Sequence, residues 1–181
     1  FLKAVQMKIV YSHLLNLLEQ KPKLEELSEL LFQLGHEHEI DGEVLDMEIT
    51  PNRGDCLSLK GLARDLNYFY QAKELPKSDM EMPALDLQFD NKAQELCPNI
   101  SFIEIEIEKV PTKYKPYLES YFADLGINKN NFFTDISNYL AYESGQPTHC
   151  FDQSTMQGHF SLAKKQLKTK FKTLLDTEIE L

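Results

Sequence analysis

The amino-acid stretch ITPNRGDCLSLKGLARDL, residues 49–66, predicts a strand end, a tight turn and a helix in direct succession. Apolar and polar residues alternate from Leu45 to Ile49, which is the period-two pattern of a half-buried strand. Turn residues follow, because proline fixes φ, asparagine mimics backbone groups and glycine tolerates positive φ. These are Pro51, Asn52 and Gly54. We refer to residues 49–66 as the strand–turn–helix motif.

The second half of the motif predicts the helix. Asp55 is expected to be its N-cap, because a carboxylate there accepts hydrogen bonds from the free amides of the first turn. Apolar residues then recur at helical spacing and give the helix one apolar face: Leu59, Leu62, Ala63, Leu66 and Phe69.

The chain has only two arginines, Arg53 and Arg64, and both lie in this motif. A guanidinium binds a carboxylate through a planar fork of donors, which an ammonium does not offer. We therefore expect at least one of them to hold a turn carbonyl, or a carboxylate across a domain boundary. Together with Asn52 and Asp55 they form a candidate structural group. Taken by itself, however, the placement of the two arginines favours a single structural salt bridge.

Composition indicates a globular protein of one large or two small domains, with 181 residues and 42% hydrophobic residues. No stretch approaches the roughly 20 apolar residues that cross a bilayer, and no signal peptide is recognisable, so we expect a cytoplasmic protein without a membrane partner. Three widely spaced cysteines predict neither a disulfide framework nor a zinc ribbon. The net charge of −10 argues against broad nucleic-acid binding; we expect no DNA partner and only local contact with RNA.

The first domain is predicted over residues 1–72. Residues 1–6 are expected to be an extension ahead of the first element. Helices are predicted over 12–21 and 24–34, with Gly35 as the C-terminal cap of the second. The dipeptide Asp41-Gly42 then predicts a two-residue hairpin turn between strands over 36–40 and 43–50.

His36-Glu37-His38-Glu39 raises the question of a metal site. On a strand the two histidines share one face, and no third ligand is near in the sequence. A solvated strand edge is the favoured interpretation, so no metal is predicted.

Residues 73–83 carry two prolines and several charges and predict a linker to a second domain over 84–181. Isoleucine alternates with glutamate over 102–108, which predicts a half-exposed strand. Helices are expected over 116–125 and about 133–143, the second burying Phe133. Further strands are expected over 85–90, 160–163, 167–173 and 178–181, and the open strand at the end suggests part of a longer protein.

Two blocks carry a family resemblance. The strand–turn–helix motif resembles a motif in the N-terminal part of the beta subunits of bacterial phenylalanyl-tRNA synthetase. The block TDISNYLAYESGQPTHCFD, residues 134–152, resembles one in the tRNA-editing domain of the same subunits, and Cys97-Pro98 matches the start of that domain. The matching positions in the second block are Asp135, Asn138-Tyr139, Gly145-Gln146-Pro147, His149, Phe151 and Asp152.

The resemblance implies an α+β fold: a small helical N-terminal domain with a β-hairpin, followed by part of a mixed, β-rich editing domain. It implies an aminoacyl-tRNA synthetase of the cytoplasm, acting in translation as two alpha and two beta subunits on phenylalanine tRNA. ATP and magnesium are expected at the alpha subunit, and no cofactor is expected in this chain.

Editing in this family removes tyrosine wrongly attached to phenylalanine tRNA. By resemblance, His149 would position the water or the terminal ribose, and Asn138 and Gln146 would supply hydrogen bonds. From the residues alone, His149 is as well explained as a structural histidine as by a general base oriented by Asp152. Cys150 is expected to be buried and apolar.

The chain departs from the family pattern at several points. Asn99 stands where the family often has an arginine, and Leu175-Asp176-Thr177 lacks a glycine. Asp41-Gly42 stands where many relatives carry an inserted OB-fold module, and the later half of the editing domain is absent. The chain alone is therefore expected to be inactive, and a degenerate subunit or a stand-alone binding module remains an alternative.

Overall fold

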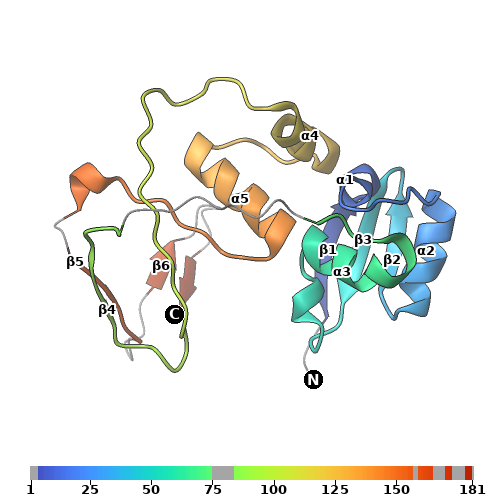
Figure 1. The fold of residues 1–181 in the computed structure, drawn as a ribbon, viewed down its shortest axis with the longest axis horizontal. Coiled ribbons are helices and arrows are strands. Elements are labelled where there is room, and N and C mark those ends of the chain that lie inside the picture. The colour runs from blue at the N-terminus through green and yellow to red at the C-terminus, as the bar shows by residue number, and fades with distance from the viewer. Residues whose placement is uncertain (1–3, 75–83, 157–158, 165–169, 173–177, 181) are drawn as a thin grey trace. The chain divides into compact units, whose positions relative to one another are not determined.

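The computed structural model describes residues 4–74, 84–156, 159–164, 170–172 and 178–180. It confirms the α+β class (Figure 1). Its internal contacts divide the chain into two units, each made of two segments: Phe1–Asp79 with Glu108–Cys150 (unit 1), and Met80–Ile107 with Phe151–Leu181 (unit 2). The predicted domain limits at 72 and 84 stay a prediction, and each unit is described here by itself.

Unit 1 contains an antiparallel sheet of three strands in the order β1-β3-β2. Asp41 pairs with Val44, so the hairpin loop is Gly42-Glu43 rather than the predicted Asp41-Gly42. The glycine, at φ +60°, takes the position that needs a positive φ. The strand β1 was not predicted, since it begins inside the expected extension. The strands are β1 (Val5–Val10), β2 (Glu37–Asp41) and β3 (Val44–Ile49).

Five α-helices of unit 1 pack with this sheet. The predicted limits of α4 are confirmed: Pro116 occupies its first turn, and Gly126 caps it in the left-handed conformation. Gly145 caps α5 in the same way, as predicted. The helices are α1 (Tyr11–Asn16), α2 (Leu24–Gln33), α3 (Leu59–Tyr70), α4 (Pro116–Leu125) and α5 (Phe132–Ser144).

One apolar core joins the sheet to all five helices. The buried face of α5 differs from the prediction, because Phe133 is 39% exposed whereas Asp135 and Tyr142 are buried. The buried carboxylate is satisfied: its Oδ2 accepts from the Tyr114 hydroxyl at 2.6 Å and its Oδ1 from the Asn130 amide at 2.9 Å. Fully buried side chains of the core include Ile9, Leu14, Leu18, Leu27, Leu31, Leu45, Met47, Leu62, Leu66 and Leu118.

The described residues of unit 2 form two small strand pairs. Phe102 contacts Phe89 and Phe160 at the pair β4–β5. The predicted strand over 102–108 is wrong: no strand lies beside it in the described part of the chain, and Ile103 and Ile105 are 59% and 67% exposed. The pairs are β4 (Gln88–Asn91) parallel to β5 (His159–Leu162), and β6 (Lys170–Lys172) antiparallel to β7 (Glu178–Glu180).

Some predictions fall outside the described residues. They include most of the linker over 73–83, the flanks of the strand over 167–173, and Leu175-Asp176-Thr177. Among the residues that are described, every helix is too short or too polar to cross a membrane.

Candidate functional site

The turn of the strand–turn–helix motif is a short 3₁₀ helix, η1 (Gly54–Cys56), followed directly by α3. Ser58 is the N-cap of α3, since its hydroxyl accepts from the Gly61 amide at 3.0 Å. The predicted cap at Asp55 is therefore wrong. The 3₁₀ turn carries the chain past Asp55 before the α-helix begins, and this carboxylate is free to bind other groups.

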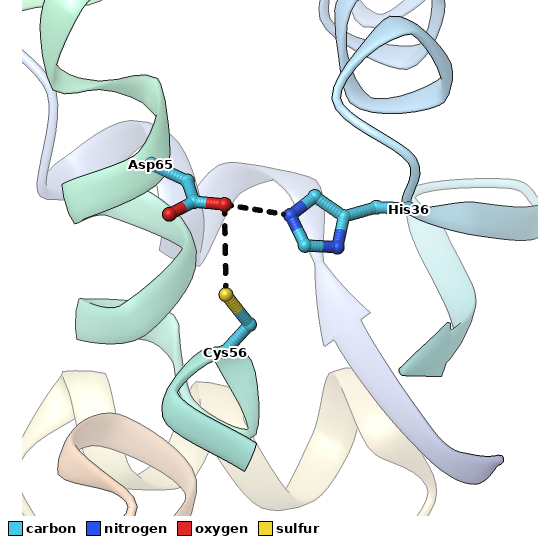
Figure 2. Close-up of side chains that lie close together, drawn as sticks. All are labelled: His36, Cys56 and Asp65. Carbon is cyan, nitrogen blue, oxygen red and sulfur yellow. Dashed lines mark hydrogen bonds and ion pairs between the residues drawn. The ribbon is translucent and has the colours of Figure 1, made fainter. Parts of the chain in front are cut away.

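The end of α2 places His36 against α3. Gly35, at φ +86°, follows the helix, and its amide donates to Phe32 O at 3.0 Å, while the His36 amide donates to Leu31 O at 2.9 Å. These two bonds form a Schellman motif, which fixes the direction in which the chain leaves the helix. The His36 side chain consequently points at Asp65 of α3, as Figure 2 shows, and is 2% exposed.

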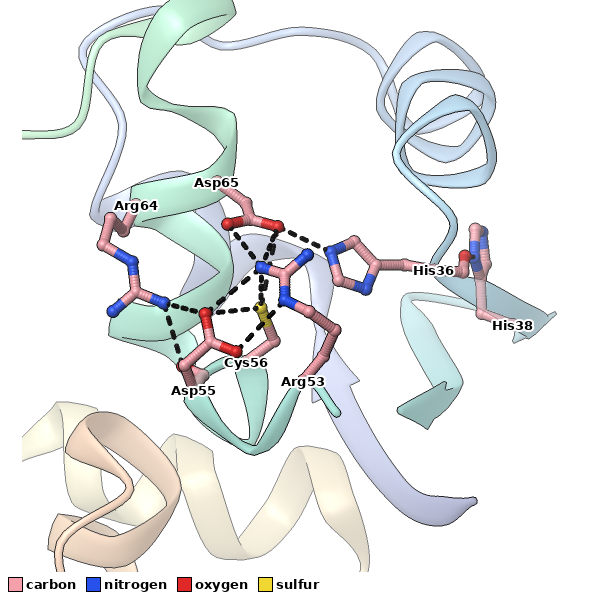
Figure 3. Close-up of polar contacts among 7 residues, drawn as sticks. All are labelled: His36, His38, Arg53, Asp55, Cys56, Arg64 and Asp65. Carbon is pink, nitrogen blue, oxygen red and sulfur yellow. Dashed lines mark hydrogen bonds and ion pairs between the residues drawn. The ribbon is translucent and has the colours of Figure 1, made fainter. Parts of the chain in front are cut away.

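Asp65 is the centre of a partly buried polar cluster. Its Oδ2 lies 2.9 Å from His36 Nε2 and 2.6 Å from Arg53 Nη2 (Figure 3). The Cys56 thiol donates to the same oxygen at 3.6 Å. Burial alone would raise the pKa of Asp65, but the hydrogen bonds from Arg53 and His36 hold that pKa below its ordinary value.

Asp55 extends this cluster to the protein surface. Arg53 Nε donates to its Oδ1 at 3.1 Å, and Arg64 donates to its carboxylate and, at 3.3 Å, to its carbonyl. Both arginines thus bind carboxylates, and Arg64 also binds a turn carbonyl, all inside unit 1. Asn52, the remaining residue of the predicted structural group, lies exposed in the turn.

The prediction of a solvated edge at His36–Glu39 is wrong for both histidines. They share one face of the chain, but this is the buried face: His38 is 8% exposed. Its Nε2 lies 2.8 Å from Ser28 Oγ, and its ring stacks on Phe32 at 4.3 Å. Glu37 and Glu39 occupy the exposed face.

The cluster also decides what chemistry is available. Ligand atoms of His36, Cys56 and Asp65 lie within 4.8 Å of one another, the spacing of metal ligands. However, Arg53 Nη2 lies 2.8 Å from Cys56 Sγ and 2.6 Å from Asp65 Oδ2, so a cation already bridges two of the three. Burial raises the pKa of the Cys56 thiol to about 12, which disfavours the thiolate that a nucleophilic reaction requires.

Sequence reasoning grouped Arg53, Asp55 and Arg64, but it missed that His36, Cys56 and Asp65 join them. His36 and Asp65 are separated by 29 positions. Nothing in the local spacing relates them, although Gly35 indicates where the chain leaves α2.

The residues assigned to editing by resemblance lie on α5 and the segment after it. Asn138, Gln146 and His149 are all exposed, and no hydrogen bond among the described residues joins them. Cys150 is exposed, so its predicted burial is wrong. The Asp152 carboxylate accepts from the Ser154 amide at 2.9 Å.

Hydrogen bonds of Tyr142 and His13, which we call the polar joint, connect α4 and α5 to the end of β1 and to α1. The Tyr142 hydroxyl accepts from the Val10 amide at 3.1 Å and lies 3.1 Å from His13 Nδ1. His13 Nε2 lies 3.0 Å from Ser120 Oγ and 3.2 Å from Asp124 Oδ2. Burial lowers the pKa of His13 below its ordinary value, although Asp124 acts in the opposite direction.

Beside this joint lies an open pocket of about 430 Å³ between β1, α4 and α5. Asn138 is on its wall. The pocket is lined mainly by apolar side chains, with a few polar ones at the rim: Gln6, Met7, Lys8, Leu57, Tyr121, Leu125, Ile127, Asn138, Ala141 and Tyr142.

Comparison with known proteins agrees with both sequence blocks. The model of the B3/4 domain family matches residues 104–181. The chain is 29% identical over 151 residues to the phenylalanine–tRNA ligase beta subunit of Psychrobacter arcticus, covering 78% of this chain and 18% of that subunit. Identity is 34% over 143 residues with the beta subunit of Aquifex aeolicus, with coverage of 77% and 18%. It is 34% over 151 residues with that of Bdellovibrio bacteriovorus, with coverage of 78% and 18%. The chain thus spans a little under a fifth of the length of these relatives.

Proposed function

Since this chain is homologous to the beta subunits of phenylalanine–tRNA ligase over most of its length, we propose that it serves as part of such a subunit. We assign it two roles: a scaffold formed by unit 1, and part of a site that hydrolyses tyrosine wrongly attached to phenylalanine tRNA. In this assignment it acts in translation in the cytoplasm, beside an alpha subunit that binds ATP and magnesium.

The scaffold role is supported by the cluster around Asp65. This one carboxylate ties the turn of the motif, through Arg53, to α3 and, through His36, to the end of α2. Three segments are thereby locked by charge-assisted hydrogen bonds, which are about twice as strong as neutral ones. A raised thiol pKa at Cys56 and a guanidinium between the candidate ligands agree with support rather than catalysis.

The editing role is supported by the match to the B3/4 domain family over 104–181 and by the exposure of His149. The aminoacylation site is shaped for phenylalanine and rejects an added hydroxyl imperfectly. A second site must therefore recognise the hydroxyl of tyrosine. An exposed imidazole can position a water molecule or the terminal ribose, and the amides of Asn138 and Gln146 can donate hydrogen bonds to the substrate.

The experiment that tests this function uses the full-length beta subunit that contains this chain. It is co-purified with a candidate alpha subunit, and the complex is assayed for phenylalanine attachment and for hydrolysis of tyrosine-charged phenylalanine tRNA. A complex that performs both reactions supports the two roles.

A degenerate subunit or a binding module without catalysis is the second candidate. Asn99, which replaces an arginine that the family often carries, favours it. A complex that attaches phenylalanine but leaves the mischarged tRNA intact would select a degenerate subunit. Failure to bind any alpha subunit would select the stand-alone module and exclude the ligase assignment.

A further inference from the structure

The strand β1 forms one edge of the unit 1 sheet and presents unpaired backbone groups there. Val10 donates its amide to the Tyr142 hydroxyl, away from β3, whereas the next residue, Tyr11, donates to Glu43 O at 2.7 Å. Backbone groups alternate in direction along an antiparallel strand. The N–H and C=O groups of Gln6 and Lys8 therefore point to the same side as those of Val10, where no described strand pairs with them.

The 430 Å³ pocket lies along this free edge. Gln6, Met7 and Lys8 line one side of it, and apolar side chains of α4 and α5 line the other. Two of these, Tyr121 and Tyr142, belong to the same buried core as Ile9 of β1. The pocket thus borders the core of unit 1 along the free edge of β1.

The outer face of the sheet carries an excess of carboxylates in register. Glu37 pairs directly with Glu48, and Glu39 pairs directly with Asp46. Like charges in directly opposite positions destabilise a sheet. On β1, Lys8 lies opposite Asp46 of β3. The neighbouring cross-strand row consists of Glu37 on β2, Glu48 on β3 and the neutral Gln6 on β1, so it contains no positive charge. A positive charge beside Gln6 would compensate that row.

We propose that the free edge of β1 binds an extended segment of another polypeptide, which adds to the sheet as a fourth strand. Its backbone pairs with Gln6 and Lys8, as in other cases of strand addition. An apolar side chain enters the pocket, and a lysine or arginine on the opposite face lies beside Gln6, within reach of Glu48. The inference does not rest on the proposed function, because it is argued only from the edge of β1, the pocket and the charges on the sheet.

The probe is a synthetic peptide of alternating lysine and valine with a central leucine, added to the 181-residue chain. Binding is measured by titration calorimetry and located by amide hydrogen exchange. We expect the amides of Gln6 and Lys8 to exchange at least about tenfold more slowly with bound peptide, while those of Met7 and Ile9 change little because they already bond to β3. A peptide with glutamate in place of lysine, and one with a central proline, are expected not to bind.

Variants of the protein separately test the three parts of the proposed binding surface, which are the backbone edge, the pocket and the Glu48 charge. Gln6→Pro removes an amide that faces away from β3, which an edge strand tolerates, and should abolish binding. Ile127→Lys should weaken it by placing a charge in the pocket. Glu48→Gln should weaken it as well, whereas Glu29→Gln, which changes an exposed carboxylate on α2, should not. Thermal unfolding verifies the fold; should Gln6→Pro not fold, the Ile127 and Glu48 variants carry the test.

Three results would overturn the proposal. The first is equal binding of the lysine and glutamate peptides. The second is unchanged affinity in a folded Gln6→Pro, Ile127→Lys or Glu48→Gln variant. The third is protection of the Gln6 and Lys8 amides in the chain alone together with a dimer in light scattering, which would assign the edge to a second copy.

Discussion

Arg53 and Asp65, separated by 12 positions in the chain, form an ion pair in which one guanidinium nitrogen contacts both carboxylate oxygens. Nη2 lies 2.7 Å from Oδ1 and 2.6 Å from Oδ2. The Asp65 side chain is only 17% exposed, so the loss of this donor would leave a partly buried carboxylate with fewer partners. This contact connects the turn of the motif to its helix.

Replacement of Arg53 by lysine should therefore destabilise the protein. A lysine cannot contact Asp55, Cys56 and Asp65 together, so we expect a loss of about 1–3 kcal/mol in the free energy of unfolding. Urea unfolding measures it, with Arg64→Lys as the control, because the Arg64 side chain is 58% exposed and should matter less. A loss within about 0.5 kcal/mol, typical of ordinary surface changes, would contradict this role of Arg53.

Gly61→Ala should also destabilise, although alanine is normally the better helix former. An added Cβ at Gly61 would lie 2.1 Å from the Asp55 carbonyl oxygen and 2.9 Å from Cys56 Cα. Because both neighbours are backbone, we expect a cost of at least about 2 kcal/mol. Gly54→Ala is the matched control, since nothing lies within 4 Å of its added Cβ. Equal stability of the two variants would show that η1 and α3 are less closely packed than described.

Two of the three cysteines, Cys56 and Cys150, should differ strongly in reactivity. Cys56 is buried with a pKa raised to about 12, whereas Cys150 is exposed. At pH 8, iodoacetamide should modify Cys150 in the folded protein and Cys56 only after unfolding. Mass spectrometry of digested samples gives the rate at each site. Modification of Cys56 in the folded state at a rate like that of Cys150 would disprove the buried cluster.

Stability should fall as the pH is lowered, with a contribution from His13. Its folded-state pKa lies below the unfolded value of about 6.5, so the unfolded chain binds more protons in that interval. The contribution of neutral His13 is therefore fully present above about pH 6.5 and decreases as the pH drops toward the folded-state pKa. Urea unfolding of the unmodified chain and of the His13→Gln variant between pH 5 and 7.5 separates the contribution of His13 from that of the titrating carboxylates. Equal pH slopes in the two proteins would refute it.

His149→Ala should reduce editing in the complete alpha–beta complex. If the imidazole positions the attacking water, hydrolysis of tyrosine-charged phenylalanine tRNA should fall by about a hundredfold, while phenylalanine attachment is unchanged. His159→Ala, which changes an exposed histidine of β5, is the control and should behave like the unmodified complex. Undiminished hydrolysis in the His149 variant would remove this residue from the editing role.

The predictions from sequence were accurate where short-range chemistry decides. Pro116 and Gly126 mark the two ends of α4, and Gly35 marks the end of α2. These residues act through their own backbone conformations, so their effect can be predicted without knowledge of distant neighbours. The two sequence blocks likewise indicated the beta subunits to which the comparisons show similarity, because the blocks are long and contain specific glycine, proline and charged positions.

Tertiary structure alone decided which polar groups meet. Asp55 and Ser58 are both suitable N-caps, but Asp55 lies within the 3₁₀ helix Gly54–Cys56, so Ser58 caps α3. His36 became buried because the end of α2 directs it at a carboxylate on α3. The alternating segment 102–108 has the pattern of a strand but is not one, since a strand requires a partner for its backbone. Local preference is a property of spacing along the chain, whereas burial and pairing depend on which segments pack together.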